Sequence, residues 1–209
     1  WTYFANDSAY HFDKYSRNYS NLINIWGADH IGYINRMKSM VEVISNKSNY
    51  LDIKICQIVR IIKGSKILKM SKREGNFITL KDILSQVGKD PLRYYMVSSK
   101  SETPMDFNID KVIEKNKDNP VFYCQYAYAR ASSVIKKATD SNAFKNYKKI
   151  NYQLDKTNIS KYEWEIILKI ISWPYILQQS AILKQPHKIT NFIEDLSASF
   201  HSFWNKGKD

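Results

Sequence analysis

The first part of the chain shows the apolar spacing that alternating strands and helices produce. A short apolar run from Leu22 to Ile25 ends at Trp26-Gly27, and apolar positions then recur at helical spacing from Tyr33 to Ile44. This order predicts a strand, a tight turn that carries Asp29 and His30, and an amphipathic helix. Side chains on such a turn lie at the carboxyl end of the strand, where open α/β sheets bind their ligands.

The next apolar positions alternate with mostly polar ones from Leu51 to Ile61 and predict a single strand. A turn at 63–65 connects it to a short partner at 66–68. Past Phe77 the pattern becomes helical. Thr79 can cap a helix over Leu80–Val87 that ends at Gly88. Asp90-Pro91 is then expected to cap and restart a helix.

The remainder reads as helices separated by polar segments. Asn119-Pro120 precedes a long helix, and the Lys- and Asn-rich stretch 136–158 is expected to be a surface connection. Ser160 and Glu163 have the spacing of a capping box, and Pro174 and Pro186 are expected to start two further helices. The predicted fold class is therefore α/β followed by all-α, with an α/β part over residues 1–117 and a helical part over 118–209.

Charge and cysteine content narrow the class of protein. The 209 residues contain 32 Lys and Arg against 20 Asp and Glu, a net charge of +12 that would attract polyanions such as nucleic acid. A general lysine-rich composition would give the same excess. Cys56 and Cys124 lie far apart without metal-ligand spacing, so no zinc is expected and a reducing, cytoplasmic location fits. No segment was expected to reach membrane-spanning length, and no membrane partner is predicted.

The strongest candidate for chemistry is the basic loop Lys69-Met70-Ser71-Lys72, which is followed by Arg73. When a carboxylate attacks the α-phosphate of ATP, negative charge grows on the leaving pyrophosphate, and ammonium groups placed there stabilise the transition state. Lys72 is the first choice for this role, Lys69 would assist, and Ser71 could donate to a phosphate oxygen. The same four residues could also form an ordinary solvated hairpin tip.

Several long stretches resemble one family, the class I aminoacyl-tRNA synthetases. KMSKREGNFITLKDIL resembles the second signature loop of that class, and DPLRYY, from Asp90 to Tyr95, resembles the element that follows it. Three stretches are similar to bacterial arginyl-tRNA synthetases: YFANDSAYHFDKY (3–15), INIWGADHIGYINRMK (23–38) and DNPVFYCQYAYAR (118–130). QPHKITNFIEDLSASFHSFWN (185–205) resembles the closing helices of their anticodon-binding domain.

The resemblance implies a Rossmann-type catalytic domain, a helical anticodon-binding domain, and a two-step reaction. Arginine would be adenylated by ATP with Mg²⁺ and transferred to its tRNA, in an enzyme expected to be monomeric at full length. By motif position, Tyr3, Asp7 and Asp29 would contact arginine, and a carboxylate suits a guanidinium. Gly27, His30 and the loop 69–72 would lie near ATP.

Aromatic and cationic side chains on the predicted helix after Pro120 suit stacking on unpaired RNA bases. Tyr126 has core spacing with Phe122 and is expected to pack, so Tyr123 and Arg130 are the predicted tRNA contacts.

Three readings stay open at this stage. The first is the arginine ligase, the second a non-catalytic RNA-binding relic of a synthetase, and the third a sister enzyme such as the cysteinyl synthetase. The first signature motif of the class, of the His-x-Gly-His kind, does not occur in these residues. The residues by themselves are therefore expected to be catalytically inactive.

Overall fold

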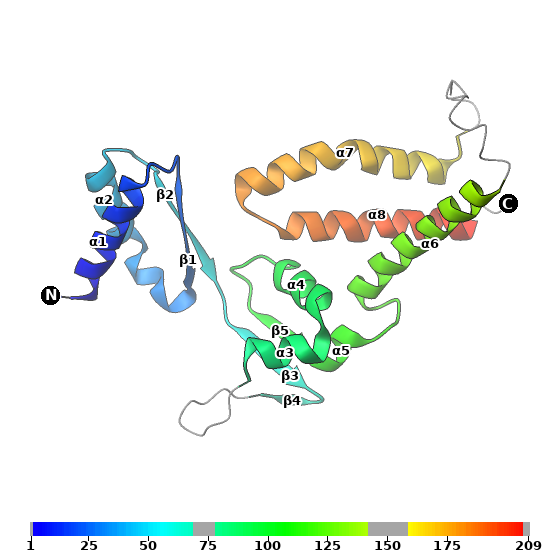
Figure 1. Cartoon of the computed structure of the whole chain (residues 1–209), viewed down its shortest axis with the longest axis horizontal. Coiled ribbons are helices and arrows are strands. Elements are labelled where there is room, and N and C mark those ends of the chain that lie inside the picture. The colour runs from blue at the N-terminus through cyan, green and yellow to red at the C-terminus, as the bar shows by residue number, and fades with distance from the viewer. Residues whose placement is uncertain (1, 69–77, 142–158, 207–209) are drawn as a thin grey trace. The chain divides into compact units, whose positions relative to one another are not determined.

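The computed structural model describes residues 2–68, 78–141 and 159–206, and the chain forms two compact units (Figure 1). The first unit contains Trp1–Arg60 and Ser101–Asp106, and the second contains Ile61–Lys100 and Phe107–Asp209. The predicted class, an α/β segment with parallel strands followed by helices, is confirmed. The predicted boundary between residues 117 and 118 does not coincide with this division by compactness and stays a prediction.

The first unit is a strand–helix–strand arrangement preceded by a helix. Its elements are α1 (Tyr3–Ser16), β1 (Leu22–Gly27), the 3-10 helix η1 (Ala28–Tyr33), α2 (Ile34–Ser45) and β2 (Leu51–Cys56). β1 and β2 pair in parallel, with Leu22 opposite Leu51 and Gly27 opposite Cys56. The predicted strand, turn and amphipathic helix are confirmed, and the turn is the 3-10 helix.

Apolar packing between the helices and the two strands holds this unit together. Met37 and Val41, one helical turn apart on α2, are only 2% and 1% exposed and contact Leu22 and Leu51 of the strands. Phe4 and Tyr15 place both ends of α1 against the same cluster. Burial of such side chains contributes about 1.5–3 kcal/mol each, so these contacts hold α1 and α2 on the sheet.

The single strand predicted from Leu51 to Ile61 is wrong, because the structure splits it into two. β2 ends at Cys56, and β3 (Val59–Lys63) belongs to a second sheet of order β4-β3-β5, with β4 at Lys66–Ile67 and β5 at Met105–Asn108. Gln57 and Ile58 lie between the strands and hydrogen-bond to the backbone of Ser101 and Met105. Two inserted residues preserve an alternation of period two, so the sequence pattern does not reveal the break.

The helix starts of the second unit follow the predicted capping signals in part. The predicted cap at Thr79 is confirmed. α3 (Leu80–Val87) begins with a capping box formed by Thr79 and Asp82. The cap expected at Asp90 is wrong. The N-cap of α4 (Lys89–Val97) is Gly88, and Asp90 lies within the first turn of the helix. Gly88 has a φ of +81°, which a glycine adopts without strain, so one residue ends α3 and begins α4.

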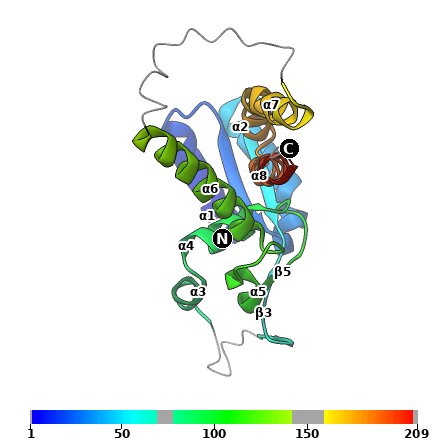
Figure 2. The ribbon, with the colours of Figure 1, turned by 90° about the vertical axis from the view of Figure 1, so that its right-hand side faces the viewer.

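The C-terminal helices are α6 (Pro120–Asp140), α7 (Lys161–Leu183) and α8 (His187–Lys206), which follow the short α5 (Ile109–Ile113). α7 and α8 lie side by side, and α8 also packs on α6 (Figures 1 and 2). The caps at Asn119 and Ser160 are confirmed, but Pro174 does not start a helix. It lies inside α7, because the capping box at Ser160 has already started that helix.

α7 also corrects the expectation that no segment could span a membrane. With 23 residues it is long and apolar enough to cross one by length and composition alone. A single helix of this kind does not establish a membrane protein, since core helices pass the same test. Its exposed apolar side chains include Leu168, Ile171 and Tyr175.

Candidate active site

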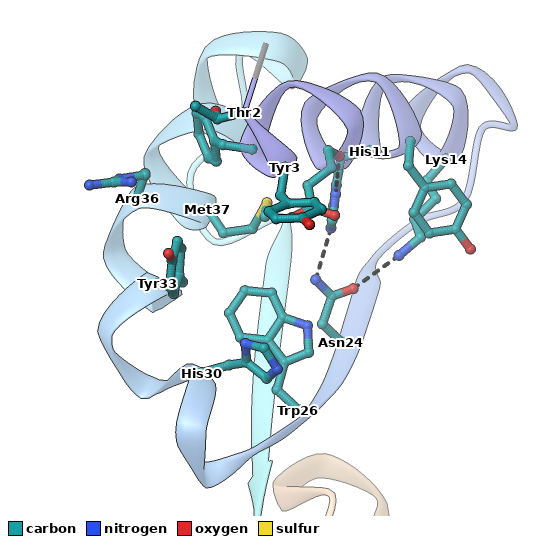
Figure 3. A pocket seen from close by; sticks show the side chains of 13 residues that line it. Thr2, Tyr3, His11, Lys14, Asn24, Trp26, His30, Tyr33, Arg36 and Met37 are labelled. Carbon is teal, nitrogen blue, oxygen red and sulfur yellow. Dashed lines mark hydrogen bonds between the residues drawn. The ribbon is translucent and has the colours of Figure 1, made fainter.

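A cavity of about 540 Å³ lies in the first unit, between α1, β1, η1 and α2 (Figure 3). Its size falls within the range of small-molecule sites in proteins. It lies beside the carboxyl end of the parallel strand β1, the edge at which α/β sheets bind ligands. The lining residues are Thr2, Tyr3, Phe4, Asp7, Tyr10, His11, Lys14, Asn24, Trp26, His30, Tyr33, Arg36 and Met37.

α1 contributes one of its faces to this cavity. Tyr3 and Asp7 are one helical turn apart, so their side chains leave the same face of the helix, and both line the cavity. Tyr3 is 90% exposed, so its ring is accessible to a ligand. The structure therefore brings together the two residues that were predicted for the guanidinium.

The carboxyl end of β1 supplies the residues predicted for the opposite side of the site. His30 lines the cavity and lies against Trp26, with ring centroids 6.2 Å apart. Asp29 is its neighbour, with 3.5 Å between the Asp29 carboxylate and His30 Nε2, but it is not among the lining residues described. Gly27 lies beneath Asp29: a Cβ atom placed on Gly27 would meet Asp29 Oδ1 at 2.6 Å.

Sequence reasoning missed a buried polar network on the cavity wall. His11 of α1 is hydrogen-bonded to Asn24 of β1, and Asn24 is hydrogen-bonded to Lys14 of α1. Two sequence signals point to this network. His11 lies one helical turn after Asp7, and Asn24 is a polar residue at a buried position of an alternating strand.

Arg36 was also missed. Its guanidinium lies over the rings of Phe4 and Tyr33, 5.7 and 5.6 Å from their centroids. Arg36 thus gives the cavity a second cation, in addition to that of Lys14. The cavity thus combines one carboxylate, from Asp7, with two cations and several aromatic rings. Such a mixture suits a zwitterionic or doubly charged ligand.

The loop Lys69-Met70-Ser71-Lys72 lies outside the described residues, but its flanks are well fixed. On one side, β3 and β4 form the predicted antiparallel hairpin, and Gly64 at its turn donates its N–H to Asp110, 2.6 Å away. On the other side, Thr79 and Asp82 cap α3. The predicted setting, between a strand hairpin and a capped helix, is confirmed.

The predicted tRNA contacts lie on α6 in the second unit. Arg130 lies over the rings of Tyr126 and Trp204, 4.5 and 5.1 Å from their centroids, and lines a hollow of about 290 Å³. Tyr123 instead packs on His201 of α8, with ring centroids 4.5 Å apart. Tyr126, expected to pack, does stack on Phe122 but remains 45% exposed. Tyr126 and Trp204, whose rings line the hollow with Arg130, are therefore additional candidates.

A polar cluster joins α4 to the helices α6 and α8. The Tyr94 hydroxyl donates a short hydrogen bond to Glu194, and burial, reinforced by this carboxylate, raises the pKa of Tyr94 well above its usual range. Burial also raises the pKa of the Cys124 thiol, which interacts with Tyr94 and Ser197. Both groups are therefore neutral at physiological pH, and the cluster links helices rather than performing acid–base chemistry.

Among the described residues, no group of three or more His, Cys, Asp or Glu side chains could hold a metal ion.

Comparison with known families fits this geometry. A model of tRNA synthetases class I (I, L, M and V) matches residues 6–110, which include most of the residues that line the cavity, and a model of the DALR anticodon binding domain matches residues 124–208. The chain belongs to the class I aminoacyl-tRNA synthetases.

Within that family, the similar proteins are arginine enzymes. The arginine–tRNA ligases of Parvibaculum lavamentivorans and Pelagibacter ubique are 42% and 44% identical over 100% of this chain. A structure described as an arginyl-tRNA synthetase from Campylobacter jejuni matches 99% of the chain and 44% of its own length, at 35% identity with a TM-score of 0.84. The arginyl-tRNA synthetase of Thermus thermophilus shares the fold, at 16% identity, 89% coverage of this chain and a TM-score of 0.61. The chain spans 36% of the length of these curated relatives.

Proposed function

We propose that the chain is the part of an arginine–tRNA ligase that binds the arginine side chain, contributes the loop Lys69–Lys72 (the lysine loop) and recognises tRNA. The reaction is the ATP-dependent formation of arginyl-adenylate followed by transfer of arginine to tRNA. The similar proteins are arginine–tRNA ligases, and no relative reported above is a cysteinyl enzyme. A non-catalytic relic would have no reason to retain the cavity side chains together with the lysine loop.

In the proposed site, Asp7 accepts hydrogen bonds from the arginine guanidinium, and Tyr3 covers it. A carboxylate paired with a guanidinium gives strong, charge-assisted hydrogen bonds. Both residues line the same cavity as Trp26 from β1 and His30 from η1. Figure 3 shows Tyr3 of α1 together with Trp26 and His30 at this cavity. Asp29, just after the end of β1, contacts arginine as well. Gly27 and His30 lie near ATP.

The chemical step joins the arginine carboxylate to the α-phosphate of ATP and releases pyrophosphate. Lys72, assisted by Lys69, stabilises the negative charge that grows on the pyrophosphate, and Ser71 and Met70 contact the nucleotide through the same loop. Mg²⁺ accompanies ATP as the counter-ion of its phosphates. The first His-x-Gly-His motif of the class is absent from these residues, so the complete site requires other parts of the enzyme.

The helices α6 and α8 supply the proposed anticodon contacts. Arg130, Tyr126 and Trp204 combine a cation with two rings at the hollow between these helices, which suits stacking on an unpaired base. Tyr123 is retained as a predicted contact, although it is half-buried against His201. The net charge of +12 would favour association with the tRNA backbone.

The convergence of Tyr3, Asp7 and His30 on one cavity carries the proposal, and an Asp7→Asn substitution in the full-length enzyme tests it. Asparagine keeps the size of the side chain but removes the charge. We expect the KM for arginine in tRNA charging to rise by about 100-fold, the equivalent of roughly 2.7 kcal/mol, because a hydrogen-bonded charge is lost.

The matched control is Asp13→Asn. Asp13 lies on the same helix, and its carboxylate pairs with Arg17 at 3.2 Å, away from the cavity. Charging kinetics within about twofold of the wild type are expected for this variant, because exposed ion pairs contribute little. An unchanged KM for arginine in Asp7→Asn would refute the assignment of the pocket.

A further inference from the structure

His11, Asn24 and Lys14 form a network of hydrogen bonds between α1 and β1. His11 is 4% exposed and Asn24 is 6% exposed, so both side chains are buried polar groups within the first unit. His11 comes from α1 and Asn24 from β1, and their side-chain bond is 2.8 Å long (Figure 3). The bond therefore connects the helix that carries Tyr3 and Asp7 to the strand that leads to Asp29 and His30.

The partners fix the direction of every hydrogen bond in this network. Lys14 Nζ donates to Asn24 Oδ1 over 3.0 Å, which orients the Asn24 amide with its NH₂ group toward His11 Nε2. Nε2 must then accept, and His11 Nδ1 carries the hydrogen that it donates to the Asp7 carbonyl oxygen at 2.7 Å. The network therefore has one satisfied arrangement of donors and acceptors, with the ring hydrogen on Nδ1.

Apart from the hydrogen bond from Lys14 to the same Asn24, the contacts that hold α1 on the core are less specific. Phe4 and Tyr15 hold the helix against the core through apolar packing, which is non-directional and tolerates small shifts along the strand. A shift of α1 by a fraction of an ångström would move Asp7 relative to His30, and binding groups lose efficiency at errors of that size. The buried bond between His11 and Asn24 resists such a shift, because a displaced partner would be left unsatisfied. The bond from Lys14 resists it less, because it ends a long, flexible side chain that can follow a small movement.

We infer that His11 is a positioning residue for arginine: its bond to Asn24 sets the register of α1 on β1, so that Asp7 and Tyr3 meet the guanidinium. This inference rests on the proposed function. His11 does not touch the reacting carboxylate or the phosphates, so its loss weakens arginine binding equally in the ground state and the transition state. Such a loss raises the KM for arginine and leaves kcat unchanged.

Two substitutions separate the two bonds of the imidazole. In His11→Gln, the amide oxygen can take the place of Nε2 and keep the bond from Asn24 while the bond to Asp7 is lost. In His11→Asn, the shorter amide can replace only Nδ1, so the bond to Asp7 is kept and the bond across to β1 is lost. Asn24→Ser removes the same cross-link from the strand side, together with the bond from Lys14. Ser16→Ala is the control, since Ser16 bonds the carbonyl of Phe12 on an exposed part of α1.

The experiment is tRNA charging by the full-length enzyme, with kcat and the KM values for arginine and ATP measured separately, and thermal unfolding recorded in parallel. We expect His11→Asn and Asn24→Ser to raise the KM for arginine by about tenfold, with kcat and the KM for ATP within about twofold of wild type. His11→Gln and Ser16→Ala should stay within about threefold in every parameter.

Equal effects of the Asn and Gln substitutions at His11, or a wild-type KM for arginine in both His11→Asn and Asn24→Ser, would overturn the inference. A parallel rise of both KM values together with a lowered Tm would also do so, because it would show a role in stability alone. Failure of the proposed function gives a different result, namely no arginine charging by the wild-type enzyme.

Discussion

Gly27 ends β1 two residues before Asp29, and the Asp29 carboxylate occupies the space where a side chain on Gly27 would begin. Because the obstructing atom is the end of a short side chain, a methyl group on Gly27 would displace the carboxylate rather than disrupt the strand. At the residue scale, the absence of a side chain at Gly27 therefore determines where Asp29 can lie.

A Gly27→Ala substitution is expected to reproduce the effect of removing Asp29. The KM for arginine, the substrate assigned to Asp29, should rise to the value found in Asp29→Ala. The free energy of unfolding should change by less than about 1 kcal/mol. Gly32→Ala is the control, since a Cβ at Gly32 meets nothing within 4 Å. Wild-type kinetics in Gly27→Ala, alongside a defect in Asp29→Ala, would show that the carboxylate works from another position.

Lys72 carries a separate prediction about chemistry. Lys72→Ala in the full-length enzyme should lower the rate of adenylate formation by about 100-fold, because the charge on the leaving pyrophosphate loses its ammonium partner. The affinity for tRNA should change by less than about threefold. Lys66→Ala, in β4 of the same hairpin, is the control. Equal losses in adenylation and tRNA binding would mean that the loop binds RNA.

Several site residues could be predicted from the sequence and others could not. Tyr3, Asp7 and His30 lie in long stretches that resemble a known family, and the structure places all three at one cavity. His11, Asn24 and Arg36 could not be assigned in the same way, because their roles depend on which residue lies opposite across α1, β1 and α2. Helical spacing relates Asp7 to His11, but only the fold brings His11 to Asn24.

At the scale of helices and strands, local signals were predicted well and long-range pairing was not. The capping boxes at Thr79 and Ser160 depend on side chains three residues apart, and both are present. β5 was missed, because Met105–Asn108 is short and forms only by pairing in the β4-β3-β5 sheet. Pro174 was misread as a helix start, although an upstream cap already determined where α7 begins.

The two capping boxes give these helix ends a defined pH dependence. Hydrogen bonds from Thr79 lower the pKa of Asp82, and those from Ser160 lower the pKa of Glu163. A lowered pKa in the folded state means that the carboxylate stabilises the fold above the pKa of the unfolded chain. That contribution disappears as the pH falls through the folded-state pKa.

Helical content followed by circular dichroism should therefore fall on acidification below about pH 4. The double variant Asp82→Asn, Glu163→Gln should lose part of this acid sensitivity, because its amide side chains accept hydrogen bonds without titrating. Identical acid transitions in the wild type and the double variant would contradict the role given to the boxes.

The side chain of Asn119, the N-cap of α6, makes several hydrogen bonds to the backbone. Its amide donates to the carbonyl oxygens of Val112 and Glu114, and its oxygen accepts from the Val121 N–H. The bonds to Val112 and Val121 are buried, and the bond to Glu114 is partly buried. Asn119→Ala should lower the free energy of unfolding by about 2–4 kcal/mol, because a cap is lost and buried backbone groups are left unpaired. Urea denaturation measures this value. Ser141→Ala, at the other end of α6, should change it by less than about 0.5 kcal/mol, and equal effects would refute the assignment.

At the scale of the whole chain, the proposed function assigns a different role to each part. The first unit holds the cavity, and the hairpin before α3 leads into the lysine loop. The helices α6 to α8 correspond to the DALR anticodon binding domain. The order of these parts was predictable from the sequence, because motifs keep their order along the chain. The division into compact units was not, because residues 101–106 return to the first unit.

The most direct test of this account is tRNA charging by the full-length enzyme, supplied with each amino acid in turn together with ATP, Mg²⁺ and total tRNA. The account predicts ATP-dependent charging with arginine alone, and loss of most of that charging in Asp7→Asn but not in Asp13→Asn. Charging with another amino acid, or binding of tRNA without any charging, would contradict it.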